Sequence, residues 1–119
     1  MKQFILLICL LLTTATFVSA QRAAERKAQI KTGLKEQVKL TDEQINAVVA
    51  IEDEFRPKLK AVRSDASLSE ADKKTKTKDL NDQKRQKLES AVGPELAKKV
   101  EAFYGTLKKH SNEEKKKEQ

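Results

Sequence analysis

A few residues about a third of the way along the chain define one helix start, and this start organises the sequence on either side of it. Thr41 suits the N-cap position, and Gln44, three residues later, suits a bond back to the Thr41 backbone, so the two make a capping box. Leu40 precedes the cap and Ile45 follows it at the spacing at which two apolar side chains pack as a hydrophobic staple. The stretch therefore predicts where a long helix begins and how the chain enters it.

The residues after this cap carry an apolar stripe with helical spacing. Its members recur at steps close to three and four: Ile45, Val48, Val49, Phe55, Leu59 and Val62. Ala47, Ala50 and Ile51 widen the apolar surface in the first half of the helix. Pro57 lies inside the pattern and removes one backbone donor, so the sequence predicts a kink near residues 53–57.

Three further helices are expected around this one, and period-two alternation typical of strands is absent. The first covers residues 22–38, with Ile30, Leu34 and Val38 on one stripe. After a turn at 64–67, Ser69 is the predicted cap of a helix over about 70–91. Pro94 suits the first position of a last helix over about 94–109. The fold class is therefore all-α, with about four helices and a long, kinked, antiparallel helical hairpin.

The last two helices differ in how many core residues they offer. In the first of them we expect Leu80 and Leu88 to be buried, together with the small residues Ala71 and Ala91. The final helix has a more regular stripe, made of Leu96, Val100, Phe103 and Leu107. This core is thin, and a chain of this size often needs a partner subunit to bury enough apolar surface, so we expect a homodimer.

Both ends of the chain differ from the middle. Residues 1–20 have a positive start, an apolar run and small residues before position 21, which is typical of a secretory signal peptide cleaved after Ala20; an uncleaved membrane anchor is the alternative. We therefore expect a helical domain over 21–109 in the periplasm. Residues 110–119 mix lysine and glutamate without an apolar residue and are expected to be a disordered tail.

The composition disfavours catalysis and metal binding. The only cysteine, Cys9, leaves with the signal peptide, and the only histidine, His110, lies in the polar tail. The sequence has no glycine-rich phosphate loop and no nucleophile motif. We therefore expect no enzyme activity, no catalytic residues, no metal site and no cofactor.

The formal net charge of the chain is +7, which favours a partner that carries negative charge. Nucleic acid is disfavoured by export and by the lack of interleaved aromatic residues, which leaves acidic stretches of proteins and a weak association with anionic membrane surfaces. For each candidate contact residue the alternative is an ordinary solvated side chain. The residues predicted to contact unfolded or partly folded envelope proteins are Ile51, Arg56, Lys58, Lys60, Arg63, Lys73, Lys74, Lys76, Lys78, Lys84, Arg85 and Lys87.

With the signal peptide and the small helical domain, the motif at Leu40, Thr41 and Gln44 resembles the LTxxQ-motif family, which includes the periplasmic chaperone Spy and the stress-response inhibitor CpxP. A second, degenerate copy falls at residues 92–96, where Pro94 and Glu95 are retained and Leu96 replaces the glutamine. The resemblance implies a curved, cradle-shaped antiparallel homodimer that suppresses aggregation without ATP, through a basic and partly apolar concave face. Metal sensing, known for some relatives, is not carried over because its ligands are missing here.

Three functions follow as expectations. The first is a periplasmic, ATP-independent holdase that binds unfolded or aggregation-prone envelope proteins. The second is an envelope-stress regulator that binds one specific folded partner, such as a sensor-kinase domain. The third is a structural envelope protein that docks on anionic lipid or wall polymer.

Overall fold

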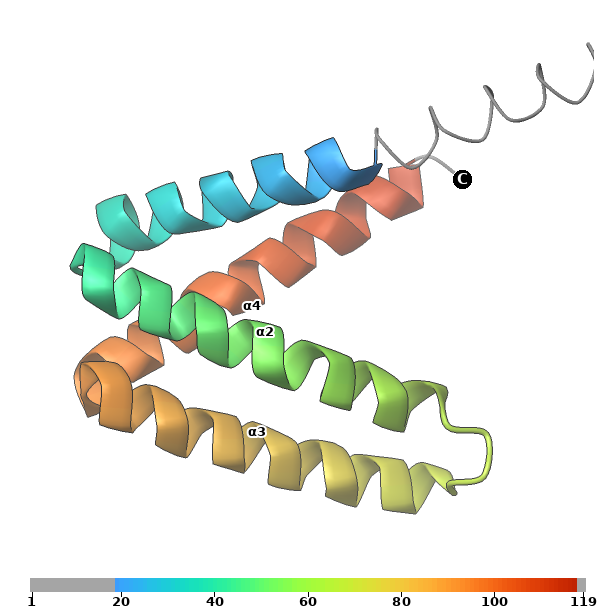
Figure 1. Cartoon of the computed structure of the whole chain (residues 1–119). Coiled ribbons are helices and arrows are strands. Elements are labelled where there is room, and N and C mark those ends of the chain that lie inside the picture. Colours follow the sequence, from blue (N-terminus) through green and yellow to red (C-terminus); the bar gives the residue numbers. More distant parts are fainter. Residues whose placement is uncertain (1–18, 118–119) are drawn as a thin grey trace, which may run out of the picture. The chain divides into compact units, whose positions relative to one another are not determined.

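The computed structural model describes residues 19–117, and every regular element among them is helical (Figure 1). A helix covers residues 19–33. It is followed by the π-helical turn η1 (Leu34–Val38) and the helices α2 (Asp42–Ser64), α3 (Glu70–Val92) and α4 (Pro94–Lys117). The all-α prediction is confirmed. The predicted signal peptide lies outside the described residues, apart from positions 19 and 20, which are helical.

The chain divides into two compact units at Gly33. In the first unit, the described residues 19–33 form a helix whose side chains are exposed except at Ile30 and Gly33, which are half-buried. The second unit begins at Leu34 and holds all the labelled helices. Within the described residues, no helix combines the length and the apolar character needed to cross a membrane.

The predicted start of α2 is confirmed in detail. The Gln44 backbone N–H donates to Thr41 Oγ1 at 3.2 Å, and the Thr41 N–H donates to Gln44 Oε1 at 3.0 Å. Leu40 and Ile45, the two members of the staple, are each 4% exposed. Just before the cap, Lys39 adopts a left-handed conformation with φ 63°, which reverses the chain between η1 and α2.

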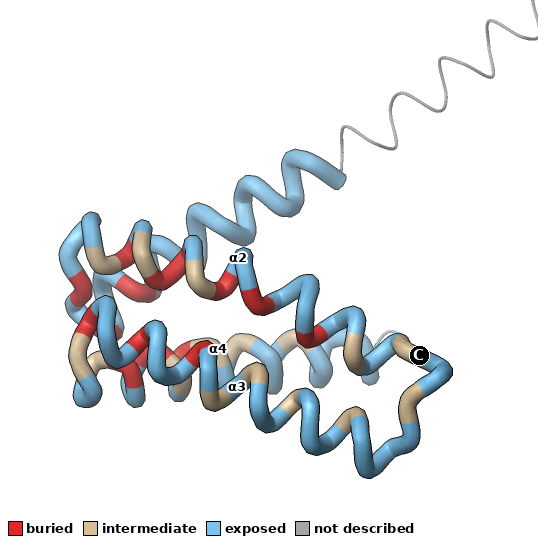
Figure 2. The backbone as a smooth tube through the Cα atoms, turned by 60° about the horizontal axis from the view of Figure 1, so that its bottom comes forward, coloured by how far each residue is buried: buried red, intermediate tan, exposed pale blue. Residues whose placement is uncertain are grey.

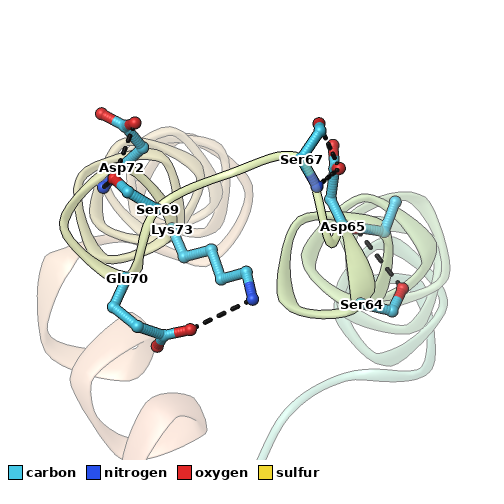
Figure 3. Close-up of polar contacts among 8 residues, drawn as sticks. Ser64, Asp65, Ser67, Ser69, Glu70, Asp72 and Lys73 are labelled. Atoms are coloured by element: carbon cyan, nitrogen blue, oxygen red, sulfur yellow. Dashed lines mark hydrogen bonds and ion pairs between the residues drawn. The ribbon is translucent and has the colours of Figure 1, made fainter.

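The turn between α2 and α3 is held by short polar side chains (Figure 3). Ser67 donates to Asp65 Oδ1 from its backbone N–H at 2.9 Å and from its hydroxyl at 2.5 Å. Ser69 caps α3 as predicted, accepting from the Asp72 N–H at 3.1 Å. Asp72 does not complete a capping box. Its carboxylate accepts from the Ser69 hydroxyl at 2.7 Å rather than from the Ser69 backbone N–H.

The long hairpin is formed by α2 and α3, which run antiparallel side by side (Figure 1), and α2 runs continuously through Pro57. The kink near residues 53–57 stays a prediction. Gly93 ends α3 with φ 86°, and Pro94 begins α4 as predicted. The final helix then continues to Lys117, so residues 110–117, predicted as a disordered tail, are helical, with cations in the last turn where they favour the helix dipole.

The core lies at one end of the second unit, where η1, the first half of α2, the end of α3 and the start of α4 meet (Figure 2). Toward the turn the hairpin has two layers only, and residues 60–83 include no buried side chain. Two small residues predicted as core, Ala71 and Ala91, are exposed, and Leu80 and Leu96 are half-buried. The buried apolar residues are Leu34, Val38, Leu40, Ile45, Val48, Val49, Phe55, Leu59, Leu88, Val92, Ala97, Val100 and Phe103.

Candidate binding surfaces

A carboxylate held by two lysines joins the two helices of the hairpin. Glu54 on α2 accepts from Lys58 of the same helix at 3.0 Å and from Lys87 of α3 at 2.7 and 2.8 Å. The same two ammonium groups lie over the ring of Phe55, at 4.9 Å and 5.4 Å from its centroid. Because Phe55 is only 1% exposed, the lysines close the edge of the core at this level of the hairpin.

Hydrogen bonds lower the pKa of two carboxyl groups on the hairpin, those of Glu54 and Asp65. The hydrogen bond from Lys87, followed by that from Lys58, holds the pKa of Glu54 below its ordinary value of 4.5. At the turn, the bonds from the Ser67 hydroxyl and backbone hold the pKa of Asp65 below 3.8. Both groups bind protons less tightly in the folded chain than in the unfolded chain, so each stabilises the fold in its ionised form.

The hairpin is therefore expected to lose stability in acid, in a defined window. Because the folded pKa of Glu54 is depressed, its contribution is fully present above pH 4.5 and is lost as the pH falls below that value. Urea unfolding midpoints should stay level between neutrality and about pH 5 and then decline. The Glu54→Gln variant should show a shallower decline below pH 4.5, and equal slopes for both proteins would contradict the assignment.

A second ion pair between the helices is almost buried. Lys84 Nζ lies 3.0 Å from Glu52 Oε1, and the two side chains are 11% and 12% exposed. Tyr104 of α4 lies close to this level of α2, and burial, followed by the charge of Glu52, raises its pKa. Lys84, which was predicted to contact client proteins, points instead into the hairpin and forms an ion pair with Glu52.

An open groove of about 660 Å³ runs between α2 and α3. Its apolar part comes from Ile51 and two alanines, and its polar part includes the Glu54–Lys87 pair. Of the predicted contact residues it therefore contains Ile51 and Lys87. The full lining, which we call the groove, is Ala50, Ile51, Glu54, Gln83, Gln86, Lys87, Ser90 and Ala91.

Most of this lining was not predicted from the sequence. Gln83, Gln86 and Ser90 are neutral polar residues at steps of three and four within the most basic helix, so the interruption in charge was a usable signal. Ala91 was expected in the core. It lines the groove because its side of α3 meets no third helix there.

The remaining predicted cations divide between two sides of the hairpin. With about 100° per residue, Lys58 and Lys76 fall on the groove side, since they lie four residues after Glu54 and seven before Gln83. Lys73 is half-buried at the start of α3 and pairs with Glu70 at 3.1 Å. Six others lie roughly 125–175° around their helices from the middle of the groove lining. We call these six the basic face: Arg56, Lys60, Arg63, Lys74, Lys78 and Arg85.

The side of α2 that carries the basic face is also the side toward α4. The charge of Arg56 acts on Tyr104 of α4, which places the two groups near each other. The groove and the basic face are therefore opposite surfaces of one hairpin. Ten of the twelve predicted contact residues are therefore divided between two surfaces, and the other two, Lys73 and Lys84, are paired with Glu70 and Glu52.

The four cations of the basic face that lie nearest the turn lack acidic partners. Arg56 and Arg85 pair with Asp53 and Asp82 at 4.0 and 2.6 Å. Within the described chain, the other four form no ion pair, although all are exposed: Lys60, Arg63, Lys74 and Lys78.

The spacing of these cations also opposes helix formation. Lys74 and Lys78 are four residues apart on α3, and Lys60 has Arg56 four residues before it and Arg63 three after it. Like charges at these spacings destabilise a helix by roughly 0.2–0.5 kcal/mol per pair. These four exposed cations make no ion pair among the described residues, so the basic face is a candidate for binding an anionic partner.

In the part of the chain that the structure describes, no three His, Cys, Asp or Glu side chains gather as metal ligands would.

Comparison of the chain with protein-family models, with curated proteins and with solved structures finds no match. Function is therefore inferred from the two surfaces of the hairpin.

Proposed function

We propose that this protein is an ATP-independent holdase, which binds unfolded or partly folded proteins in the periplasm through the groove between α2 and α3. The observation that supports this most directly is an open groove with a small apolar part and a charged, amide-rich rim. Such a surface accepts segments of varied sequence, because it has no enclosed pocket that selects one side chain. Lys58, Lys76 and Lys87 on the same side would attract acidic segments.

The apolar part of the groove is small enough for reversible binding. A client side chain that buries two or three methylene groups against Ile51, Ala50 and Ala91 gains about 2 kcal/mol. A millimolar dissociation constant alone requires about 4 kcal/mol, so one contact holds a client only briefly. Several contacts together, or attraction by the lysines, are needed to retain a chain, and each of them breaks readily.

Other features of the proposal come from the sequence. The signal-peptide pattern would deliver the chain to the periplasm, and the LTxxQ resemblance supports a chaperone or a stress regulator. A kinked hairpin and a cradle-shaped homodimer belong to the same proposal. They would place two grooves on one assembly and increase the retention of a long client.

The proposal predicts suppression of aggregation that depends on Ile51. The purified chain should slow the aggregation of a chemically denatured client, without ATP, at near-stoichiometric amounts. Ile51→Asp should remove most of this protection, because it places a charge in the apolar part of the groove. Light scattering during dilution of the client from denaturant measures the effect.

A matched control is Ala102→Asp, which introduces the same charge at an exposed position of α4. This control should protect as well as the unaltered chain, and both variants should keep the same helical circular dichroism. The proposal fails if several-fold excess of the unaltered chain gives no protection. It fails equally if Ile51→Asp protects as well as the control does.

A further inference from the structure

The four unpaired cations of the basic face form a two-dimensional array. Lys60 and Arg63 lie near the end of α2, and Lys74 and Lys78 lie near the start of α3, which runs beside it in the opposite direction. All six cations of the face span about 16 Å along the hairpin, and the two helices are separated by about 10 Å. All six side chains are exposed.

We infer that this face docks on an anionic lipid bilayer. Each lysine or arginine near a negatively charged membrane surface contributes favourable attraction that requires no defined partner geometry. The array provides that kind of attraction, since it consists of long flexible side chains on two adjacent helices. Lipid headgroups present charge over an area, as the array does, so the two surfaces are complementary.

The array fits a membrane better than it fits an acidic protein segment. An extended segment recognised by its sequence is held by pockets or by fixed bidentate contacts along one line. The basic face has two separated rows of cations, and the groove lies on the opposite side of the hairpin. All six positions of the basic face are charged. Attachment through them is therefore electrostatic and is screened by salt.

Docking by this face leaves the groove directed away from the membrane. The hairpin then holds clients on one side while the cations on its other side, four of them near the turn, contact lipid. This arrangement goes beyond the proposed holdase function, because lipid binding requires only the basic face and is measured without a client.

Vesicle binding of the full chain tests the inference. The chain should sediment with vesicles of phosphatidylcholine containing a third phosphatidylglycerol at low salt, and remain in solution with pure phosphatidylcholine. Binding should disappear at 1 M salt, where the screening length is about 3 Å. Arg63→Gln with Lys78→Gln should weaken binding roughly 30-fold, since each cation accounts for about a fivefold effect. Both positions make no ion pair among the described residues, so the variant should fold normally.

The matched control changes two cations on the groove side, Lys58→Gln with Lys76→Gln, and removes the same net charge. It should bind vesicles within a few-fold of the unaltered chain. Equal weakening by both variants would overturn the inference, because net charge alone would then explain binding. Soluble polyglutamate that binds as tightly as vesicles of equal charge would overturn it in favour of an acidic protein partner.

The same variants separate this inference from the holdase proposal. Arg63→Gln with Lys78→Gln should suppress client aggregation as well as the unaltered chain does. Lipid binding without any suppression of aggregation supports the inference and refutes the holdase proposal. Suppression without lipid binding at low salt refutes the inference alone.

Discussion

Replacement of Phe55 by alanine is expected to lower the free energy of unfolding by about 3–5 kcal/mol. Phe55 is among the largest fully buried side chains, at 1% exposure, and it lies where the core narrows toward the two-layered hairpin. Its removal leaves a cavity between α2 and α3 and takes away the ring beneath Lys58 and Lys87. A unit of this size is stabilised by roughly 0.05–0.15 kcal/mol per residue, so the loss is a large part of the total.

Urea unfolding followed by far-ultraviolet circular dichroism measures this change. A suitable control is Val62→Ala, which also removes apolar volume from α2 but at a half-buried position nearer the turn. The control should lose about 1 kcal/mol. Comparable losses for the two variants would mean that Phe55 is not the structural link between the core and the hairpin.

Replacement of Lys84 by methionine should be almost as harmful, for an electrostatic reason. The change keeps most of the side-chain volume and leaves Glu52 without its partner at 12% exposure. Removing one member of a buried ion pair costs about 3 kcal/mol or more, because the remaining charge stays in a poorly solvated site. The neighbouring change Arg85→Met breaks an exposed pair with Asp82 and should alter stability by less than about 1 kcal/mol.

A double-mutant cycle separates the ion pair from packing. Glu52→Leu with Lys84→Met replaces both charged partners by apolar side chains and should recover most of the stability lost in the single variant. Chemical unfolding of the four proteins gives the coupling energy. If the double variant is less stable than Lys84→Met alone, the unpaired carboxylate is not the cause of the loss.

The sequence alone was sufficient to place the helix starts. Thr41 with Gln44, Ser69 and Pro94 act through hydrogen bonds or dihedral preferences within a few residues, and all three starts are found where predicted. The all-α class followed for the same reason, since helical spacing is a local property. The end of α4 lies later than predicted, because lysine and glutamate have good helix propensity and residues 110–117 continue the helix.

Burial of charge could not be predicted in this way. Lys84 looks like every other lysine of its helix, and only the approach of Glu52 from α2 makes it an interior residue. Exposure of Ala71 and Ala91 has the same origin, because no third helix covers those sides of α3. Burial depends on what packs against a residue from elsewhere in the chain.

The division of the cations into two surfaces was also decided by tertiary structure. A helical pattern states which residues share a side of one helix, but it does not state which sides of two helices face the same way. That relation is set by the packing of α2 against α3 and by the position of α4. Local hydrogen bonds and side-chain periodicity thus determined the helices of this protein, whereas its groove and its basic face exist only because distant segments pack together.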